Sequence, residues 1–263
     1  MAYEVIQGDC VDVMGGMDAE SVHAVVTSPP YAMQRAAQYG GVPESEYPEW
    51  TVRWMHEVRR VLVPQGSVII NIREHVKDGQ ISDYVHHTRL ALRDAGWFEW
   101  DELIWHKKSS APIGHPKRPR RSWERLLWFG KERQGWCDAK ANGGVSDRIA
   151  HPKPFMKTHQ SGWISNATSP MRKGIARQTD VCWADTSNFI GHPAAYPPEL
   201  AAWCIKLIAP PGGTILDPFN GSGSTGVACV TNGFNYIGCE IDPQYADIAR
   251  NRIDAAMPQG VAV

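Results

Sequence analysis

The chain has 263 residues, of which 43% are hydrophobic, and its formal net charge at pH 7 is −1. A chain of this length and hydrophobic content can form one large α/β domain, or one domain with an inserted lobe, around a sizeable core. The near-zero charge excludes a uniformly basic nucleic-acid-binding protein, although it allows a local basic face.

Two further features bear on where the protein works. No apolar run is long enough to cross a bilayer, and the first residues lead directly into a strand-like segment, so we expect neither a membrane span nor a signal peptide. The six cysteines form no CxxC pair. That spacing favours reduced thiols over disulfides or a zinc site, and it predicts a cytoplasmic protein that holds no metal.

The N-terminal part has the pattern of two strands joined by a short helix. We predict strands over residues 3–7 and 22–27 and a helix over 11–17. The second strand runs into Ser28-Pro29-Pro30-Tyr31. Two consecutive prolines cannot continue a strand ladder, because both lack an N–H and fix φ near about −65°.

The proline pair therefore predicts a stiff loop at the carboxyl end of a strand, which is the edge where ligands bind in open α/β sheets. The loop presents the hydroxyl of Ser28, the carbonyl of Pro29 and the ring of Tyr31. Two acceptors beside a stacking ring suit a planar molecule that carries an NH₂ group. The alternative is a proline-rich turn that binds nothing.

Regular elements and loops alternate after Tyr31. The segment 31–48 is rich in polar and small residues, which predicts a mobile loop. The predicted elements that follow are a helix over 47–62 ending before a turn at 64–66, a strand over 67–72, a helix over 81–95, and antiparallel strands over 97–105 and 123–129.

Basic residues gather between and around these last two strands. Only Glu124 opposes them within the stretch, and Pro112, Pro116 and Pro119 keep much of it extended. The basic residues are Lys107, Lys108, Lys117, Arg118, Arg120, Arg121 and Arg125.

Residues 134–190 have no sustained period and are rich in Gly, Ser, Asn, Trp and basic residues. We interpret them as an inserted lobe or loop system, because Trp136, Phe155, Trp163 and Trp183 need somewhere to pack.

The last third again alternates helices and strands. The predicted elements are a helix over 197–208, a strand over 214–217, a helix over 225–231, a strand over 236–240 and a helix over 243–257.

A strand, a Gly-x-Gly turn, a helix and a second strand ending in an acid form the pattern of a nucleoside-binding site. Here Gly221-Ser222-Gly223 follows Asp217, and the acid is Glu240. The glycines let the backbone approach a ligand, and the acid can accept hydrogen bonds from both ribose hydroxyls. The motif lacks the third glycine of dinucleotide sites and the lysine of a P-loop, so neither NAD nor ATP is expected. The alternative is a tight turn without a ligand.

Together the two motifs resemble those of a known family. The stretch 217–223 (Asp-Pro-Phe-Asn-Gly-Ser-Gly) is similar to the S-adenosylmethionine motif of amino-methylating DNA methyltransferases, and 26–31 (Val-Thr-Ser-Pro-Pro-Tyr) is similar to their catalytic loop. The order, with the catalytic loop first, resembles the circularly permuted beta subgroup. The stretch 192–197 (His-Pro-Ala-Ala-Tyr-Pro) is similar to that subgroup's helix-start motif beside the cofactor.

The resemblance implies a Rossmann-like α/β fold of the class I methyltransferase type. Its sheet is expected to have seven mostly parallel strands, with one reversed edge strand and helices on both faces. The implied organisation is a catalytic half over 1–133, an inserted target-recognition region over 134–190 and a cofactor-binding half over 191–263.

The resemblance also implies the work of the proline loop. An enzyme that modifies an amine within a base pair must extrude the base from the stack. Ser28 Oγ and the Pro29 carbonyl are expected to accept the two amine hydrogens, with Pro30 in the same loop, while Tyr31 stacks on the extruded base.

The implied cofactor is S-adenosylmethionine. Asp217 is expected to orient the glycine turn, Glu240 to hold the ribose, and Asp9 to take the adenine amine. For Asp9 the alternative is a helix N-cap. The other expected cofactor-binding residues are Cys10, Phe219, Asn220, Gly221, Gly223 and Ser224.

The implied substrate is double-stranded DNA, with the basic cluster neutralising phosphates along its path. The alternative for that cluster is a solvated charged loop. A homodimer and a cognate restriction endonuclease are further expectations of the resemblance.

The loop resembles the cytosine-N4 version more than the adenine-N6 version, which usually carries Asp where Ser28 stands. We therefore predict site-specific methylation of cytosine N4. Adenine-N6 methylation is the main alternative. A protein or small-amine methyltransferase, which also uses a Pro-Pro-Tyr loop, and a non-catalytic DNA-binding protein are more distant ones.

Overall fold

The structure is a computed structural model that describes residues 2–33, 41–107, 109, 117–144, 155–158, 164–167, 175–186 and 196–258. The chain divides into two compact units. One comprises Met1–Cys137 and Asp180–Val263, and the other is Asp138–Thr179. The domain boundaries at 133 and 190 stay predictions.

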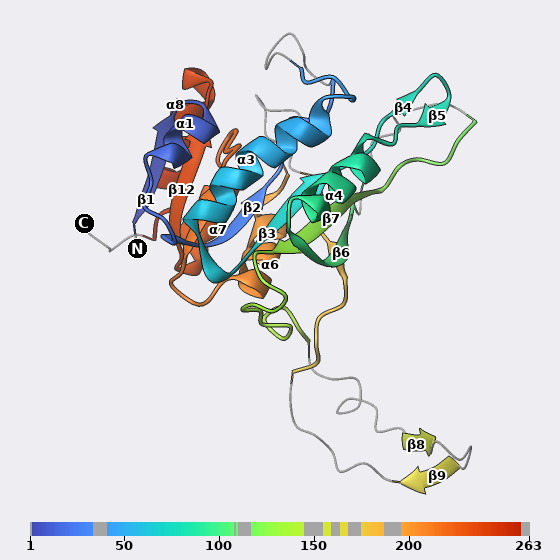
Figure 1. Ribbon diagram of the computed structural model, residues 1–263. Coiled ribbons are helices and arrows are strands. Elements are labelled where there is room, and N and C mark those ends of the chain that lie inside the picture. Colours follow the sequence, from blue (N-terminus) through green and yellow to red (C-terminus); the bar gives the residue numbers. More distant parts are fainter. Residues whose placement is uncertain are drawn as a thin grey trace. The chain divides into compact units, whose positions relative to one another are not determined.

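The larger unit is built on an eight-stranded sheet in the order β1-β12-β11-β2-β3-β7-β6-β10 (Figure 1). The strands in that order are β1 Tyr3–Gln7, β12 Asn235–Glu240, β11 Thr214–Asp217, β2 Val22–Thr27, β3 Leu62–Ile72, β7 Trp123–Gly130, β6 Phe98–His106 and β10 Val181–Trp183.

Seven of these strands are parallel, and β7 alone runs against both of its neighbours. The predicted mostly parallel α/β fold is therefore confirmed, but two details differ. The sheet has an eighth strand, β10, which pairs with β6. The reversed strand lies inside the sheet, because β6 turns back into β7 and β7 fills the space between β6 and β3.

Helices cover both faces of the sheet (Figure 1). They are α1 Cys10–Gly15, α3 Tyr47–Val61 and α4 Tyr84–Asp94 on one face, and α6 Pro198–Ile208, α7 Ser224–Asn232 and α8 Pro243–Ala256 on the other. Successive residues of the central strands enter opposite cores: Val25 packs with α3, while Ala24 and Val26 pack with α6. A strand buried on both faces reads as a continuous apolar run, which is why 22–27 was recognisable.

The sequence prediction missed how α3 joins β3. The strand begins at Leu62, directly after the helix, and the predicted turn lies inside it as a bulge. Leu62 pairs with Val22 and Ser67 pairs with Ala24, so four residues of β3 stand opposite one residue of β2. The bulge brings Gly66 so close to the backbone of β2 that a Cβ there would lie 2.8 Å from the carbonyl oxygen of His23.

The segment before α4 holds a short hairpin, β4 Val76–Lys77 and β5 Gln80–Ile81, so the helix starts at Tyr84 instead of 81. The smaller unit contains another hairpin, β8 Phe155–Thr158 and β9 Ile164–Ala167. The expectation that Trp183 packs inside a lobe is wrong, because this residue lies on β10 of the main sheet and is 61% exposed. Trp163 lies outside the described residues.

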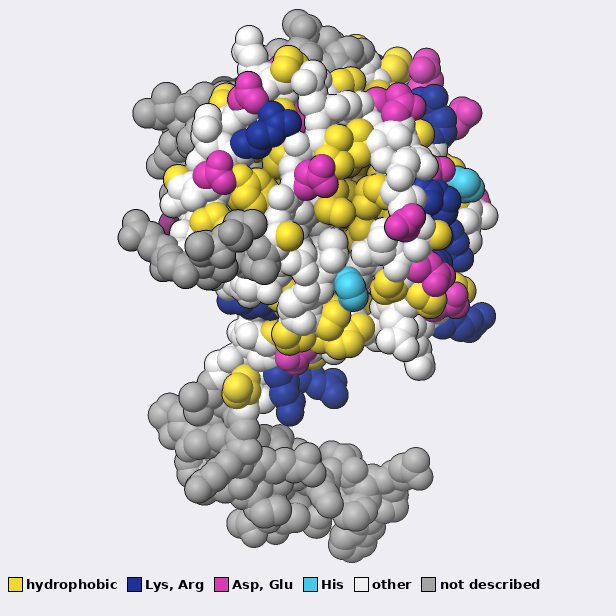
Figure 2. Space-filling model, turned by 90° about the vertical axis from the view of Figure 1, so that its left-hand side faces the viewer, with side chains coloured by type: hydrophobic (Ala, Val, Ile, Leu, Met, Phe, Trp, Pro, Cys, Tyr) yellow, Lys and Arg dark blue, Asp and Glu magenta, His cyan; other side chains and the backbone are white. Residues whose placement is uncertain are grey.

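The surface agrees with the low net charge. On the face shown in Figure 2, acidic side chains are interspersed with apolar ones, and Lys and Arg side chains form separate small groups. All six cysteines are free thiols. Among the described helices, none has the length and apolar character that a membrane span requires.

Gly66 offers a test of the bulge. We expect Gly66→Ala to lower the free energy of unfolding by roughly 1–3 kcal/mol, because the new methyl overlaps Leu62 and the His23 carbonyl. Urea denaturation measures the change. Gly15→Ala is the matched control, since nothing lies within 4 Å of a Cβ at that position. A Gly66→Ala protein as stable as the Gly15→Ala protein would contradict the packing described.

Candidate active site

The carboxylate of Asp217 joins the two predicted motifs. This residue ends β11, is 1% exposed, and accepts a hydrogen bond from Thr27 Oγ1 at 2.6 Å. Thr27 ends the neighbouring strand β2 and immediately precedes Ser28. Because β2 and β11 are parallel and adjacent, the proline loop and the glycine turn leave the sheet side by side at one edge.

Asp217 has three more donors. Its Oδ1 accepts the Phe219 N–H at 3.1 Å, and its Oδ2 accepts the hydroxyls of Thr225 at 2.6 Å and Tyr196 at 3.2 Å. Burial raises the pKa of Asp217 above its ordinary value, and these hydrogen bonds act in the opposite direction. Its predicted role of orienting the turn agrees with this geometry.

The glycine turn depends on the conformations that its sequence allows. Gly221 and Gly223 have φ of 52° and 83°, a region that favours glycine. A Cβ on Gly223 would also lie 2.9 Å from the Cβ of Ala249 in α8. The side chain of Asn220 points into the core, where its Oδ1 accepts the Tyr236 hydroxyl at 2.6 Å. Asn220 therefore stabilises the turn from the side that faces the core.

Glu240 lies at the end of β12 and is tied to the same turn. Its Oε2 accepts the N–H of Gly221 at 2.7 Å and its Oε1 accepts the N–H of Asp242 at 3.0 Å. Burial raises the pKa of this carboxyl, and the two backbone hydrogen bonds oppose that shift. Each oxygen keeps a lone pair beyond its backbone bond, so the group can still accept from a ligand.

Asp9 and Cys10 follow β1, whose end is fixed to β12 by a hydrogen bond from the Gly8 N–H to the Glu240 carbonyl at 2.9 Å. The N-cap interpretation of Asp9 is confirmed, since its Oδ1 accepts the Val11 N–H at 2.8 Å. Burial raises the pKa of the Cys10 thiol to about 12. Cofactor contacts by either residue stay predictions.

Two features of this region bear on ligand binding: the hydroxyl of Ser224, a predicted cofactor residue, and an aromatic cluster around Phe219, another predicted one. The hydroxyl of Ser224 is buried and lacks a hydrogen-bond partner among the described residues. In the glycine turn, the ring of Phe219 packs on Trp50 and Trp54 of α3, with ring centroids 5.4 and 5.2 Å apart. The two tryptophans were predicted only as the apolar face of a helix.

The proline loop is held from two sides. Tyr47 of α3 donates its hydroxyl to the Pro30 carbonyl at 2.9 Å. Tyr31 donates its hydroxyl to Glu124 Oε2 at 2.7 Å, and the pKa of that phenol is raised by burial and by the carboxylate. Ser28 is half-buried and Pro29 is buried. The loop residues are thus fixed before any substrate arrives.

Glu124 is a site residue that the sequence analysis missed. It is 7% exposed, and its second oxygen accepts the Lys107 ammonium at 2.5 Å. The only signal in the sequence was an isolated acid within a basic stretch. Since it lies at the start of the reversed strand β7, only the antiparallel pairing brings it to Tyr31.

The basic cluster is more strongly paired than predicted. Arg125 pairs with Glu74 at 2.5 Å and with Glu102, and Arg121 pairs with Glu74 at 3.6 Å. The expectation that Glu124 alone opposes the cluster is therefore wrong, because Glu74, which follows β3, and Glu102 of β6 also pair with it. Three exposed members of the predicted DNA-binding set are Lys117, Arg118 and Arg120. Lys108 lies outside the described residues.

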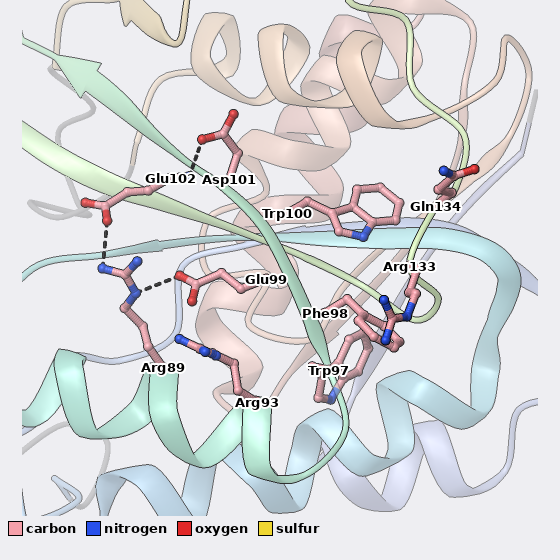
Figure 3. Close-up of a pocket in the computed structure, with 10 residues that line it drawn as sticks. All are labelled: Arg89, Arg93, Trp97, Phe98, Glu99, Trp100, Asp101, Glu102, Arg133 and Gln134. Carbon is pink, nitrogen blue, oxygen red and sulfur yellow. Dashed lines mark hydrogen bonds and ion pairs between the residues drawn. The ribbon is translucent and has the colours of Figure 1, made fainter.

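A hollow of about 850 Å³ lies where α4 meets the start of β6 (Figure 3). Two of its acids, Glu99 and Glu102, pair with Arg89 at 2.7 Å each. The residues of β6 that line it, Phe98–Glu102, lie at the opposite end of that strand from Trp105, which pairs with Glu124 beside the proline loop. We therefore place the site at the edge organised by Asp217.

Comparisons with known proteins agree with this site. Residues 22–251 match the family model described as DNA methylase, of the N6/N4 type. The chain is 27% identical to type II methyltransferase M.SmaI of Serratia marcescens over 95% of its own length and 90% of the relative. It is 25% identical to type II methyltransferase M.PvuII of Proteus hauseri over 90% and 80% of the two chains.

Solved structures share the fold. The cytosine-N4-specific PvuII DNA methyltransferase superposes with a TM-score of 0.74 at 20% identity, covering 100% of this chain and 89% of the other. A putative DNA modification methylase of Thermus thermophilus, complexed with S-adenosyl-L-methionine, gives 0.67 at 23% identity over 98% and 96%. The family predicted from the two motifs is confirmed: the chain belongs to the N6/N4 family of DNA methylases.

Proposed function

We propose that this protein transfers a methyl group from S-adenosylmethionine to the N4 amine of a cytosine extruded from duplex DNA. One observation carries the proposal: the 2.6 Å hydrogen bond between Thr27 and Asp217, which seats the proline loop beside the glycine turn. Transfer of a methyl group to an amine requires that the two substrates bind side by side. Here the acceptors for the amine and the turn for the nucleoside lie at one edge of the sheet.

The residues of the turn fit the cofactor. Gly221 and Gly223 let the backbone approach it, the unpartnered hydroxyl of Ser224 can bond a polar group, and Glu240 can hold the ribose. Asp217 and Glu240 are carboxylates whose pKa burial raises, so a cationic ligand relieves the unfavourable burial of their charge. When bound, S-adenosylmethionine supplies an electrophilic methyl group on a sulfonium.

The proline loop orients the nucleophile. Ser28 Oγ and the Pro29 carbonyl accept the two hydrogens of the amine, which turns its lone pair away from conjugation with the ring. Tyr31, held by Glu124, provides the stacking surface. Ser28 is a neutral hydroxyl and a weak base, so the amine loses its proton after the methyl bond has formed. Most of the acceleration comes from positioning, which can contribute about 7–11 kcal/mol.

Cytosine is favoured over adenine by Ser28 and by the likeness to a methyltransferase named cytosine-N4-specific. Adenine N6 is the second candidate, because the matched family covers both types. The test is to methylate mixed-sequence DNA, hydrolyse it to nucleosides and map the modified positions. N4-methylcytosine nucleoside is expected; recovery of the N6-methyladenine nucleoside alone would refute the choice of base.

The relatives named type II methyltransferases suggest a restriction-modification context. We infer that a cognate restriction endonuclease attacks the same sequence when it is unmethylated, and that residues 134–190 supply target recognition. The residues proposed to contact phosphates are Lys107, Lys108, Lys117, Arg118, Arg120, Arg121 and Arg125. A homodimer remains part of this proposal.

Removing the Ser28 hydroxyl tests the amine contact. We expect Ser28→Ala to lower kcat about 10- to 100-fold, because one hydrogen bond that aims the lone pair is lost, while cofactor affinity stays the same. Single-turnover methylation and isothermal titration separate the two effects. Ser21→Ala is the control, since the Ser21 hydroxyl donates to the Asp18 carbonyl within its own turn. Equal kcat in both variants would exclude Ser28 from the reaction.

Cofactor affinity should depend on the charge of Glu240. Because the pKa of Glu240 is raised, its carboxylate takes up a proton at a higher pH than an ordinary glutamate, and affinity should fall as pH drops through that pKa. Glu240→Gln should bind more weakly and lose this pH dependence. Titrations between about pH 4 and 8, with Glu4→Gln in β1 as control, measure it, and an unchanged profile in Glu240→Gln would count against the assignment.

Glu124 and Tyr31 should act as one unit. Tyr31→Phe and Glu124→Ala each remove the same hydrogen bond, so their effects on kcat should be far from additive, with a coupling of roughly 0.5–3 kcal/mol. A double-mutant cycle on methylation rate gives the value. The same variants should bind cofactor normally. Additive losses would show that Glu124 does not work through Tyr31.

A further inference from the structure

The β4–β5 hairpin leaves the sheet edge that carries the active site. It follows β3 after the short segment 73–75 and projects beyond the sheet (Figure 1). Its two central residues, Asp78 and Gly79, both have positive φ, of 49° and 80°. That is the signature of a tight two-residue hairpin turn of type I′, which matches the twist of the flanking strands.

An apolar pair stands exposed on this hairpin. Val76 and Ile81 are directly opposite each other in the register and are 43% and 60% exposed. Single exposed apolar side chains are common on proteins. Two that face the same way on a short projecting hairpin form a compact apolar edge, and α4, which starts at Tyr84, does not cover it.

The hairpin is held in place at its base and at its tip. Glu44 accepts hydrogen bonds from His75 Nε2 at 2.5 Å and from Ser82 Oγ at 2.9 Å, so one carboxylate fastens both ends. At the tip, Arg118 Nη2 donates to the Gly79 carbonyl at 2.8 Å. These three hydrogen bonds fix the orientation of the hairpin before it contacts a partner.

Short contacts connect the hairpin to the proline loop. Arg73, at its foot, lies 3.9 Å from the Glu124 carboxylate that holds Tyr31. On the other side the rings of His75 and Tyr84 are 5.6 Å apart. Tyr84 in turn packs edge-on against Tyr47, whose hydroxyl bonds the Pro30 carbonyl. The hairpin therefore lies beside the place where the extruded base is expected.

The positive charge around Val76 and Ile81 indicates what kind of partner the hairpin binds. Lys77, Lys117, Arg118 and Arg120 are exposed on the hairpin and on the segment that reaches it, against one carboxylate, that of Asp78, among the described residues of these two segments. An apolar edge framed by cations suits a polyanion that can also receive apolar side chains between its stacked layers. Duplex DNA has both properties.

We propose that the β4–β5 hairpin enters the duplex next to the target base pair, with Val76 and Ile81 taking the space that the extruded base leaves. The inference rests on the proposed function, in which the base leaves the stack. Apolar wedges of this kind stabilise an unstacked step, and extrusion is least demanding when the base is already unpaired. The hairpin contributes to extrusion and takes no part in the methyl transfer.

The test compares two substrates in the doubly substituted protein Val76→Ser, Ile81→Ser. On a fully paired duplex containing the mapped site, we expect the single-turnover rate to fall at least about tenfold, because the gap is no longer filled. On the same duplex with the target base mispaired, we expect the rate to return to within about twofold of the unsubstituted protein. Leu90→Ser on α4, where the leucine is 53% exposed, is the matched control and should leave both rates unchanged.

A second readout does not depend on the chemistry. With 2-aminopurine at the target position and thymine opposite it, so that the target stays paired, the fluorescence rise caused by the unsubstituted protein should be lost in the double variant and kept in Leu90→Ser. An equal rise in the double variant, or an equal loss of rate on paired and mispaired DNA, would overturn the proposal. The proposal would also be overturned if, without DNA, the double variant sedimented differently from the unsubstituted protein, because the hairpin would then be a contact between copies of the chain. If the unsubstituted protein methylates no cytosine, the proposed function fails while the fluorescence test still decides the hairpin.

Discussion

A buried negative charge holds this site together. Asp217 accepts hydrogen bonds from Thr27, Phe219, Tyr196 and Thr225, which belong to the end of β2, the glycine turn, the start of α6 and the first turn of α7. An ionised carboxyl without partners would be strongly unfavourable in this position, so each donor is needed and each is constrained. The two reactive segments are held together because neither can move without taking a hydrogen-bond donor away from that buried charge.

Carboxylates with several partners also fix the residues near the proline loop. Glu124 of β7, Glu74 from the segment after β3 and Glu102 of β6 pair with Lys107, Arg121 and Arg125. These ion pairs set the positions of side chains more than they stabilise the fold, since bringing charges out of water offsets their attraction. A protein with a net charge of −1 can thus work on DNA with a few exposed cations at one edge.

The sequence allowed most of the larger unit to be predicted, because its central strands are apolar on both faces and its two motifs sit where strands end. What it could not supply were pairings between distant segments. The reversed strand looked like an edge strand, since nothing local states that β7 pairs with both β3 and β6. Glu124 looked like a stray charge for the same reason. The β4–β5 hairpin escaped notice because its strands are only two residues long, although Asp78-Gly79 is a strong turn signal.

The two ends of the larger unit lie together in the framework. β1 pairs with β12 along its whole length, and α8 packs against it, with Arg250 donating to the Val5 carbonyl at 2.9 Å. The opening strand and the closing helix are therefore immediate neighbours. A circular permutation that joins β1 to α8 by a short linker and opens new termini in a surface loop between the two motifs would reverse their order in the sequence. Every strand pairing would be kept. The order of the two motifs in the sequence can therefore change while the arrangement of the active site stays the same.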